Sequence, residues 1–473
     1  MIEAELTAAR TGETVRAQAG SGGEPVATLP PQPKTVRESG LELPMLVELT
    51  AKAMYSGAKI PLPVLAGKLR LSIGVMREVL EAMVAEQMAE AGWGGDTDLD
   101  LQYHLTAAGK QRATEYLVRC RYAGPAPVTL QAYRDVCLRQ STRQADAPRI
   151  GAAEMAAAFA EDHLDAAVCE QLGASLQSSR SLLLYGPSGS GKSTLARKLG
   201  QLQQGLVAVP YAILVDQDII QFYDPLVHLA PSQAARQGEN QRSVDARWTL
   251  CQRPVVQVGA ELSQDMLDLR FDNANGVYQA PPHFMANGGM LVVDDLGRQR
   301  VAPADLLNRW SSPLEAGIDQ LTVEGGHKVG VPFDATLVFV TNYAPQRLLD
   351  DASMRRLGYK IQIGALTEQN YRALFRHQCR LLRITHDDAV AEHLLTRLHG
   401  PAGRPLLAST PRELLSRICD FASFSGISPR LTIASLEQAW VSMFAGCAYG
   451  HASPSLPPAP YNAYGSDPLL ERI

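Results

Sequence analysis

The sequence lacks the features that mark membrane or secreted proteins. It contains no run of 18 or more apolar residues, and the N-terminus has no basic segment followed by an apolar stretch. A transmembrane helix needs about 20 apolar residues, and a secretory leader needs that basic and apolar pair. We therefore expect a cytoplasmic protein without membrane insertion.

Paired cysteines and excess positive charge are also missing. The seven cysteines are scattered and never form a CxxC pair, which is typical of reduced thiols. The histidines show no HExxH or Cys-His spacing, so no zinc is expected. The formal net charge of -5 excludes broad electrostatic attachment to phosphate backbones or anionic lipid. Any nucleic-acid contact would have to be local.

The composition is that of a globular protein, because 46% of the residues are hydrophobic and 20% are charged. A chain of 473 residues predicts several domains. Periodicity and Pro/Gly content divide it into six parts. They are a flexible extension (1–40), a winged-helix-like domain (41–118), a linker with one short helix (119–150), an α/β domain (151–365), an α-helical domain (366–448) and a flexible Pro-rich tail (449–473).

Residues 41–118 predict three helices with helix-turn-helix spacing, then strand, wing, strand and a closing helix. The YHLT stretch resembles small winged-helix domains of bacterial regulators. A DNA-reading module needs basic residues on its third helix and wing. Here Arg77 stands among acidic residues of that helix and wing, which are Glu78, Glu81, Glu86, Asp96, Asp98 and Asp100. The balance favours docking of protein or dimerisation over DNA reading.

A complete GxxxxGK[ST] pattern, GPSGSGKS at 186–193, follows the apolar run 181–185 and precedes a predicted helix. Backbone N–H groups of such a loop face phosphates. Lys192 would reach the β and γ phosphates of ATP, and the Ser193 hydroxyl would bind Mg²⁺. The predicted nucleotide-binding residues are Gly186, Pro187, Ser188, Gly189, Ser190, Gly191, Lys192, Ser193 and Thr194.

A second motif, GMLVVDD at 289–295, is an apolar run that ends in two acids. Its continuous apolar character predicts a parallel strand covered on both faces. Asp294 would hold Mg²⁺ directly or through water, which makes Ser193 and Asp294 the predicted metal ligands. Asp295 would orient the attacking water. This is a Walker B element, so ATP and Mg²⁺ are the expected cofactors.

With these motifs, residues 165–445 resemble the AAA+ family of P-loop ATPases. The resemblance implies a parallel sheet between helices, followed by an α-helical lid. Asn342, after the apolar run 337–340, looks like sensor 1, and Arg412 in TPRELL looks like sensor 2. Arg355 or Arg356 would be the arginine finger, with Arg356 slightly favoured; two surface arginines at a helix end are the alternative. The family usually has Glu where this chain has Asp295, so hydrolysis could be slow.

Two further stretches resemble the MoxR-like branch, which has a helix-2 insert and a hairpin before sensor 1. Residues 271–295 look like the insert, and the segment between Asp295 and Asn342 predicts helix, strand, Gly325-Gly326 turn and strand. The GAFTGA sequence of sigma-factor activators is absent. Residues 211–225 predict another hairpin and loop. Four aromatic side chains on the inserts either face a pore or pack: Tyr278, His283, Phe284 and His327.

The leading hypothesis is a ring-forming ATPase, implied by the resemblance to be a hexamer, that remodels or assembles a protein partner. An ATP-dependent DNA-binding regulator is the second hypothesis. An ATP-gated switch that hydrolyses slowly is the third, motivated by Asp295.

Overall fold

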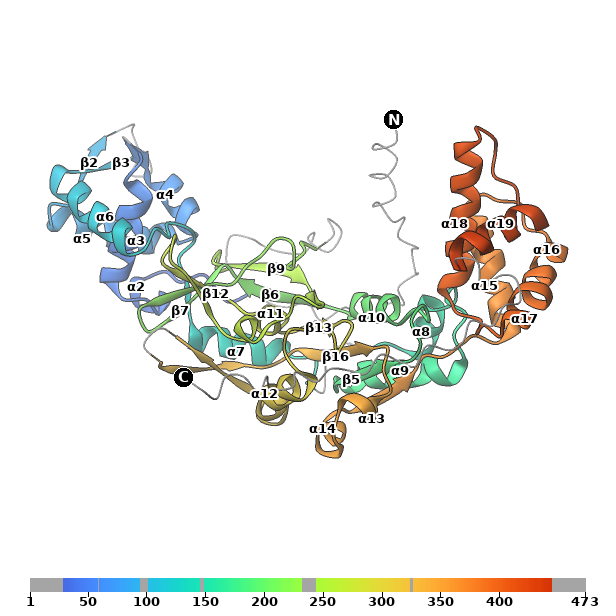
Figure 1. Ribbon diagram of the computed structural model, residues 1–473. Helices are drawn as coiled ribbons and strands as arrows, with labels where there is room; N and C mark the ends of the chain where they lie inside the picture. Colours follow the sequence, from blue (N-terminus) through green and yellow to red (C-terminus); the bar gives the residue numbers. More distant parts are fainter. Residues whose placement is uncertain are drawn as a thin grey trace, which may run out of the picture. The chain divides into compact units, whose positions relative to one another are not determined.

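The computed structural model describes residues 29–57, 59–93, 101–144, 149–231, 244–323 and 326–444 (Figure 1). Two compact units divide the chain. The first contains residues up to Ala158, Ala166–Gly186 and Lys192–Ile363, and the second contains Phe159–Asp165, Pro187–Gly191 and the residues from Gly364. The predicted tail 449–473, the first 28 residues of the predicted extension, and the wing acids Asp96, Asp98 and Asp100 lie outside the described residues.

A five-stranded parallel sheet lies at the centre of the first unit. Its strands, in spatial order, are β10 (Val255–Val258), β13 (Met290–Val293), β16 (Thr336–Thr341), β5 (Leu182–Tyr185) and β17 (Tyr359–Gln362). Every residue of β13 and β16 is buried, as expected for parallel strands covered on both faces. The carboxyl ends of these strands meet at one edge of the sheet. The predicted α/β P-loop fold is confirmed.

Helices flank this sheet. They are α8 (Ala152–Ala158), α9 (Ala166–Ser178), α10 (Lys192–Gln201), α12 (Pro303–Ala316), α13 (Pro345–Leu348) and α14 (Asp351–Arg356). Helix α10 contacts β5, β10, β13 and β16, whereas α9 contacts β17. Trp310 of α12 is fully buried in the core beneath the sheet. The apolar residues of α12 and of four of the five strands therefore share one core.

The predicted hairpin before β16 is present. It consists of β14 (Ile318–Thr322) and β15 (Lys328–Pro332), which pair antiparallel after α12; Gly325 of the predicted turn is outside the described residues. Asp319 of β14 is buried, with its carboxylate bonded to Arg309 of α12 and 2.7 Å from His283 Nε2. His283 lies on α11 (Pro282–Met285). Contacts of the Asp319 carboxylate thus join the hairpin to α11 and α12.

A second sheet is mixed in direction. Its order is β11 (Arg270–Asp272), β12 (Val277–Gln279), β8 (Asp218–Gln221), β7 (Ala212–Val215) and β4 (Val128–Thr129), and a separate antiparallel pair joins β6 (Leu206–Pro210) to β9 (Trp248–Gln252). Strands β7 and β8 form the hairpin predicted within 211–225. The short 3₁₀ helix η3 (Gln264–Leu267) precedes β11. The predicted helix-2 insert therefore contributes mainly two strands to this sheet.

Residues 119–150 differ from the predicted linker. Strand β4 pairs with β7, and the following helix α7 (Leu130–Gln140) buries Tyr133, Val136 and Cys137. The Ser141 hydroxyl donates to Asp334 Oδ1 at 2.6 Å, just before β16. The segment is an integral part of the first unit because its contacts come from residues far along the chain. A two-residue strand and three buried side chains are too small a pattern to identify in the sequence.

The predicted winged-helix region has helices and strands in the expected places. They are α3 (Leu43–Met54), β1 (Ile60–Pro61), α4 (Leu62–Leu69), α5 (Ile73–Ala85), β2 (Ala89–Trp93), β3 (Leu101–Leu105) and α6 (Ala107–Arg119), with sheet order β1-β3-β2. We call these elements the N-terminal module. Thr106 begins α6 by accepting a hydrogen bond from the Gly109 N–H, as a helix N-cap does.

Part of the predicted flexible extension 1–40 is ordered. Residues 29–40 include helix α2 (Val36–Ser39), and Pro31 forms a β-bridge with Val244. The buried guanidinium of Arg247 donates to the carbonyl oxygens of Ser39 and Pro127. Arg247 also forms a two-pronged ion pair with buried Asp245. The segment is held by partners more than 200 residues away, which local composition does not reveal.

The second unit is mainly helical. Its helices are α15 (Glu368–Leu381), α16 (Asp388–His393), η4 (Leu394–His399), α17 (Gly400–Ala402), α18 (Ser409–Phe424) and α19 (Ile433–Phe444). They share a core that contains Tyr371, Phe375, Leu414 and Trp440. The expected α-helical domain 366–448 is described as far as Phe444. Within the described part of the chain, no helix has both the length and the apolar character required to span a membrane.

Candidate nucleotide site

The GxxxxGK[ST] loop joins β5 to α10, and its first glycine has a strict steric requirement. Gly186 has φ of +144°, and a Cβ atom on it would lie 2.1 Å from the Ile363 carbonyl oxygen. Any side chain would therefore displace the backbone that follows β17. At the other end of the loop, Lys192 is 4% exposed and its Nζ donates to the Gly186 carbonyl oxygen at 3.0 Å. The Lys192 ammonium group therefore lies beside Gly186, the residue that follows β5.

Burial lowers the pKa of Lys192, while the negative charges of Asp295 and Asp294 act in the opposite direction. Burial disfavours the ammonium form because it removes the charge from water. An anion placed at this loop would favour the ammonium form.

The structure brings the two predicted metal ligands together. Ser193 Oγ donates to Asp294 Oδ1 at 2.8 Å, although the residues are 101 positions apart. A serine hydroxyl that donates its proton to a carboxylate still has lone pairs for a cation. Mg²⁺ is held in proteins by one or two carboxylates and keeps several waters. Ser193 and Asp294 therefore fit Mg²⁺; the described residues contain no group of three or more His, Cys, Asp or Glu that could hold a metal ion.

The second acid of the motif contacts the predicted sensor. Asn342, which follows β16, donates through Nδ2 to Asp295 Oδ1 at 3.0 Å. Asp295 has φ of +53°, in the left-handed region where Asp is among the few tolerated non-glycine residues. Its neighbour Leu296 donates through its N–H to the Val340 carbonyl oxygen at 2.6 Å. The strained backbone is thereby held at the carboxyl end of β16, with the Asp295 carboxylate beside Asn342.

Two glutamines at this edge were missed by the sequence analysis. Gln257 of β10 donates through Nε2 to Asp294 Oδ2 at 3.0 Å. Gln299 donates to the Asp294 carbonyl oxygen at 2.7 Å and accepts from the Gly297 N–H. The one available signal was a lone amide in the apolar run Pro254–Val258. Gln299 lies in a turn, where glutamine has no distinguishing pattern.

Arg355 and Arg356 occupy the predicted position at the end of α14, before β17. Asp350 caps the start of this helix by accepting from the Ser353 N–H at 2.8 Å. Hydrogen bonds from Ser353 lower the pKa of Asp350, and the charge of Arg356 adds a smaller effect. Both arginines are exposed. Among the residues that the structure describes, no hydrogen bond or ion pair joins either arginine to Asp294 or Asp295.

Arg412 lies in the first turn of α18, in the second unit, and is exposed. That unit also contains the loop residues Pro187–Gly191. The Ser409 N–H donates to the Gly189 carbonyl oxygen at 2.9 Å. Gly189 has φ of +83°, and a Cβ there would lie 2.6 Å from Ser409 Oγ. The predicted sensor 2 helix therefore begins against the predicted phosphate loop.

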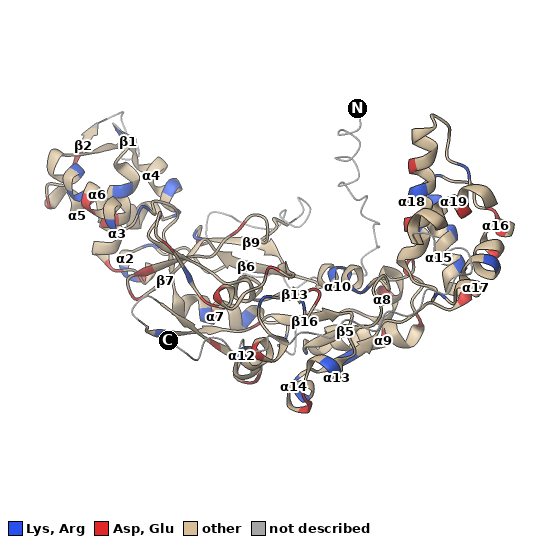
Figure 2. Cartoon of the chain, viewed as in Figure 1, with Lys and Arg blue, Asp and Glu red and all other residues tan. Residues whose placement is uncertain are grey.

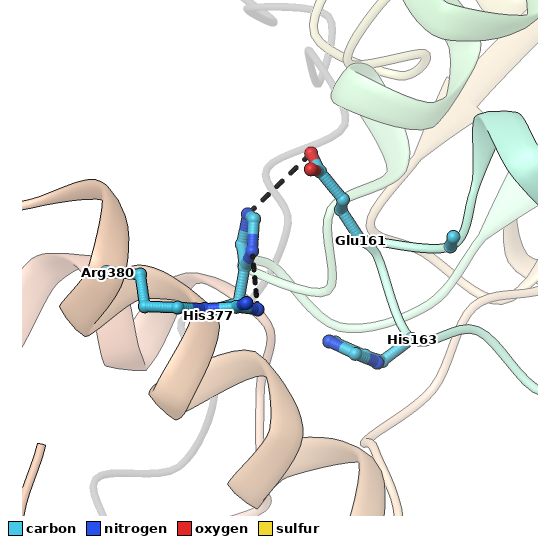
Figure 3. A pocket seen from close by; sticks show the side chains of 5 residues that line it. Glu161, His163, His377 and Arg380 are labelled. Atoms are coloured by element: carbon cyan, nitrogen blue, oxygen red, sulfur yellow. Dashed lines mark hydrogen bonds and ion pairs between the residues drawn. The ribbon is translucent and has the colours of Figure 1, made fainter.

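An open pocket of about 300 Å³ lies in the second unit, lined by Ala160, Glu161, His163, His377 and Arg380 (Figure 3). His377 Nε2 is 3.7 Å from Glu161 Oε2, and His377 Nδ1 is 3.5 Å from Arg380 Nη2. Burial, followed by the charge of His377, lowers the pKa of His163. Two imidazoles, one carboxylate and one guanidinium make the lining of this pocket polar. No sequence motif predicted it.

The pore interpretation is excluded for three of the four aromatic residues. Tyr278, His283 and Phe284 are 2%, 1% and 1% exposed, so they pack in the interior. Phe284 contacts Tyr133 and Phe222 edge-on at centroid distances of 5.5 and 4.9 Å. His327, beside the hairpin turn, is exposed.

Residues 367–442 match the family model of a domain of unknown function (DUF8689). No curated protein matches the chain. Among solved structures, the chain is similar to NtrX from Brucella abortus in complex with ATP, with 14% identity, TM-score 0.37 and coverage of 71% of this chain and 63% of NtrX. It is also similar to the RuvB Holliday junction branch migration motor of Thermotoga maritima, with 15% identity and TM-score 0.33. This match covers 59% of this chain and 68% of RuvB. The chain thus spans less than two thirds of the NtrX chain.

Proposed function

We propose that this protein is an AAA+ ATPase that binds Mg-ATP and hydrolyses it. The observation that carries the proposal is the hydrogen bond from Ser193 to Asp294 at the edge of the parallel sheet. It pairs the end of the phosphate loop with the Walker B acid. The contact of Asn342 with Asp295 at the same edge adds a second pair of groups. Together they supply a cation site and a water-orienting site.

Each residue of the site has a role in this mechanism. Lys192 would hold the β and γ phosphates, and backbone N–H groups of the loop would face the same oxygens. Mg²⁺ bound by Ser193 and Asp294 would neutralise charge that develops on these phosphates. Asp295, oriented by Asn342, would position water for in-line attack on the γ phosphorus and accept its proton, while the bond from that phosphorus to the bridging oxygen breaks and ADP leaves. Arg412 would contact the γ phosphate from the helical lid.

We further propose a head-to-tail ring, which the AAA+ resemblance implies to be a hexamer, in the cytoplasm. The exposed position of Arg355 and Arg356 at a helix end supports an arginine finger that acts on the ATP of an adjacent subunit. The described cysteines are free thiols, in keeping with a reducing compartment. We propose a MoxR-like ATPase. The hairpin before β16 and the insert strands in the second sheet support this assignment. Work on a protein partner is the proposed output.

The N-terminal module is proposed to be a winged helix that docks protein rather than DNA. Helix-turn-helix readers contact bases with the first residues of their second helix. Here a Cβ on Gly74, at the start of α5, would lie 2.5 Å from the Lys34 carbonyl oxygen, and Glu78 Oε2 accepts from the Val36 N–H at 3.0 Å. Figure 2 shows Lys and Arg interspersed with Asp and Glu along the module's helices. Residues 34–36 therefore contact the first turns of the helix that a DNA reader would use.

The test is steady-state ATP hydrolysis combined with mass determination in ATP. We expect a ring-sized mass, loss of turnover in Lys192→Ala, and loss in either Arg355→Ala or Arg356→Ala with nucleotide binding kept. Arg347→Ala is the matched control, because Arg347 is an exposed arginine on neighbouring α13. A monomer with no turnover and no nucleotide binding would contradict the proposal.

A slow ATP-gated switch is the second candidate, favoured by the short Asp295 side chain. Replacing Asp295 with Glu would extend the carboxylate by one methylene toward the water. If the short Asp295 side chain limits the rate of ATP hydrolysis, Asp295→Glu raises turnover. A fall in turnover would indicate that the left-handed backbone at this position accepts only the shorter acid.

A further inference from the structure

The Asp294 carboxylate has hydrogen-bond donors on both of its oxygens. Ser193 Oγ and the Asp295 N–H donate to Oδ1, at 2.8 and 3.0 Å. Gln257 Nε2 donates to Oδ2 at 3.0 Å. All three donors belong to the first unit. Both carboxylate oxygens therefore accept hydrogen bonds from within the first unit.

The strand register brings the glutamine to this position. Gln257 of β10 lies opposite Val292 of β13, and Val258 lies opposite Val293. The Asp294 N–H donates to the Val258 carbonyl oxygen at 2.8 Å, which extends the pairing by one step. Val256 and Val258 are buried, whereas Gln257 is exposed between them. Its amide reaches Asp294 from the adjacent strand.

The donors differ in how they can respond to a cation. Ser193 can bind Mg²⁺ through a lone pair while it continues to donate its proton to Oδ1. The Asp295 N–H is part of the backbone and stays in place. Oδ2 is then the oxygen left for the cation or for one of its bound waters, because Mg²⁺ usually keeps several waters. The Gln257 N–H occupies that oxygen.

We propose that Gln257 is a positioning residue that competes with hydrated Mg²⁺ for Asp294 Oδ2 and so sets the Mg²⁺ concentration at which the nucleotide complex forms. The inference rests on the proposed function, because it concerns the same Mg-ATP site. The side chain is exposed, so water satisfies its amide when it leaves the carboxylate. The net strength of such a hydrogen bond corresponds to an effect of about 2- to 10-fold on binding.

The experiment measures binding of a fluorescent ATP analogue to the full chain over a range of Mg²⁺ concentrations and in EDTA. Gln257→Leu keeps the side-chain bulk and removes the donor, and Gln257→Asn keeps an amide that is one methylene too short. Gln221→Ala is the matched control, because Gln221 is an exposed glutamine on β8. We expect both Gln257 variants to lower the half-saturating Mg²⁺ concentration about 2- to 10-fold. Binding in EDTA should stay unchanged.

An unchanged or raised half-saturating Mg²⁺ concentration in both variants would overturn the inference, because the amide would then merely orient Asp294 or do nothing. If the unsubstituted protein fails to bind the analogue with or without Mg²⁺, the proposed function fails instead. Thermal melting of each variant separates loss of fold from loss of the contact, and either variant alone is sufficient for the test.

Discussion

The parallel sheet and the second sheet belong to one unit but are held together differently. The central strands of the parallel sheet, β13 and β16, are wholly buried and mostly apolar, and polar groups gather at their carboxyl ends. The second sheet has strands of two to four residues drawn from residues 128–279, and buried polar pairs such as Asp245 with Arg247 fix its surroundings. Polar groups at the edge are thus available to a ligand, whereas those around the second sheet are consumed in assembly. Substitutions in the two regions should separate function from stability.

The largest expected loss of stability follows from Arg247→Ala. Removing one partner of a buried ion pair leaves the Asp245 carboxylate without compensation, which costs about 3–5 kcal/mol. The change also removes the donors to the Ser39 and Pro127 carbonyl oxygens. Urea unfolding measures the loss. The double variant Asp245→Ala/Arg247→Ala should lose less, and an equal or greater loss would show that the ion pair is not the main contact.

Tyr133→Ala should destabilise the first unit by about 3–5 kcal/mol through the cavity it creates. Tyr133 is 2% exposed and contacts Phe222, Trp248 and Phe284. Tyr133→Phe is the control: it keeps the ring and removes the hydroxyl, which accepts from Asn287 Nδ2 and also interacts with the Cys137 thiol, so we expect a loss of about 1 kcal/mol. The free energy of unfolding is again the measured quantity. If neither variant lowered the free energy of unfolding by more than about 0.5 kcal/mol, as expected for a surface residue, residues 119–150 would be a linker.

Lys192→Ala should affect nucleotide binding far more than stability, unlike the two substitutions above. The lysine makes a hydrogen bond to Gly186, but burial already disfavours its charge, so the free energy of unfolding should change by no more than about 1 kcal/mol. Binding of an ATP analogue should be lost. Paired measurement of melting and binding checks this. A large loss of stability with binding retained would place Lys192 with the structural polar groups.

The smallest effect concerns pH and the buried His283. Burial lowers its pKa, although the hydrogen bond and charge of Asp319 oppose the shift and Arg309 adds to it. The unfolded chain therefore binds more protons than the folded protein as pH falls below about 6.5. Stability is fully present above that pH and falls below it, by up to about 1.4 kcal/mol per pH unit.

Unfolding in urea at pH 7.5 and 5.5 tests this dependence. Hydrogen bonds from His283 and Arg309 outweigh the effect of burial and lower the pKa of Asp319, so that carboxylate loses its contribution only at more acidic pH. His283→Gln should reduce the difference between the two pH values, whereas substitution of the exposed His327 by Gln should leave it unchanged. An identical difference in all three proteins would assign the pH dependence to other groups.

The sequence alone determined the parallel-sheet fold and the positions of the nucleotide motifs. A phosphate loop needs glycines and a lysine in consecutive positions, and a strand buried on both faces needs a continuous apolar run such as Met290–Val293. Both requirements are local, so they are visible in short stretches. The helices of the second unit show equally local periodicity.

Only the tertiary structure decided the role of residues 119–150, the packing of residues 29–40 and the place of Gln257 beside Asp294. Each depends on partners far away in the chain, such as Asp334 for Ser141 and Arg247 for the Ser39 carbonyl oxygen. Nothing in the sequence marks Tyr278 and Phe284 as core residues, but in the structure both are buried in a cluster with Tyr133 and Phe222. A single polar side chain has no periodicity, so its partner is known only when the strand register brings the two together.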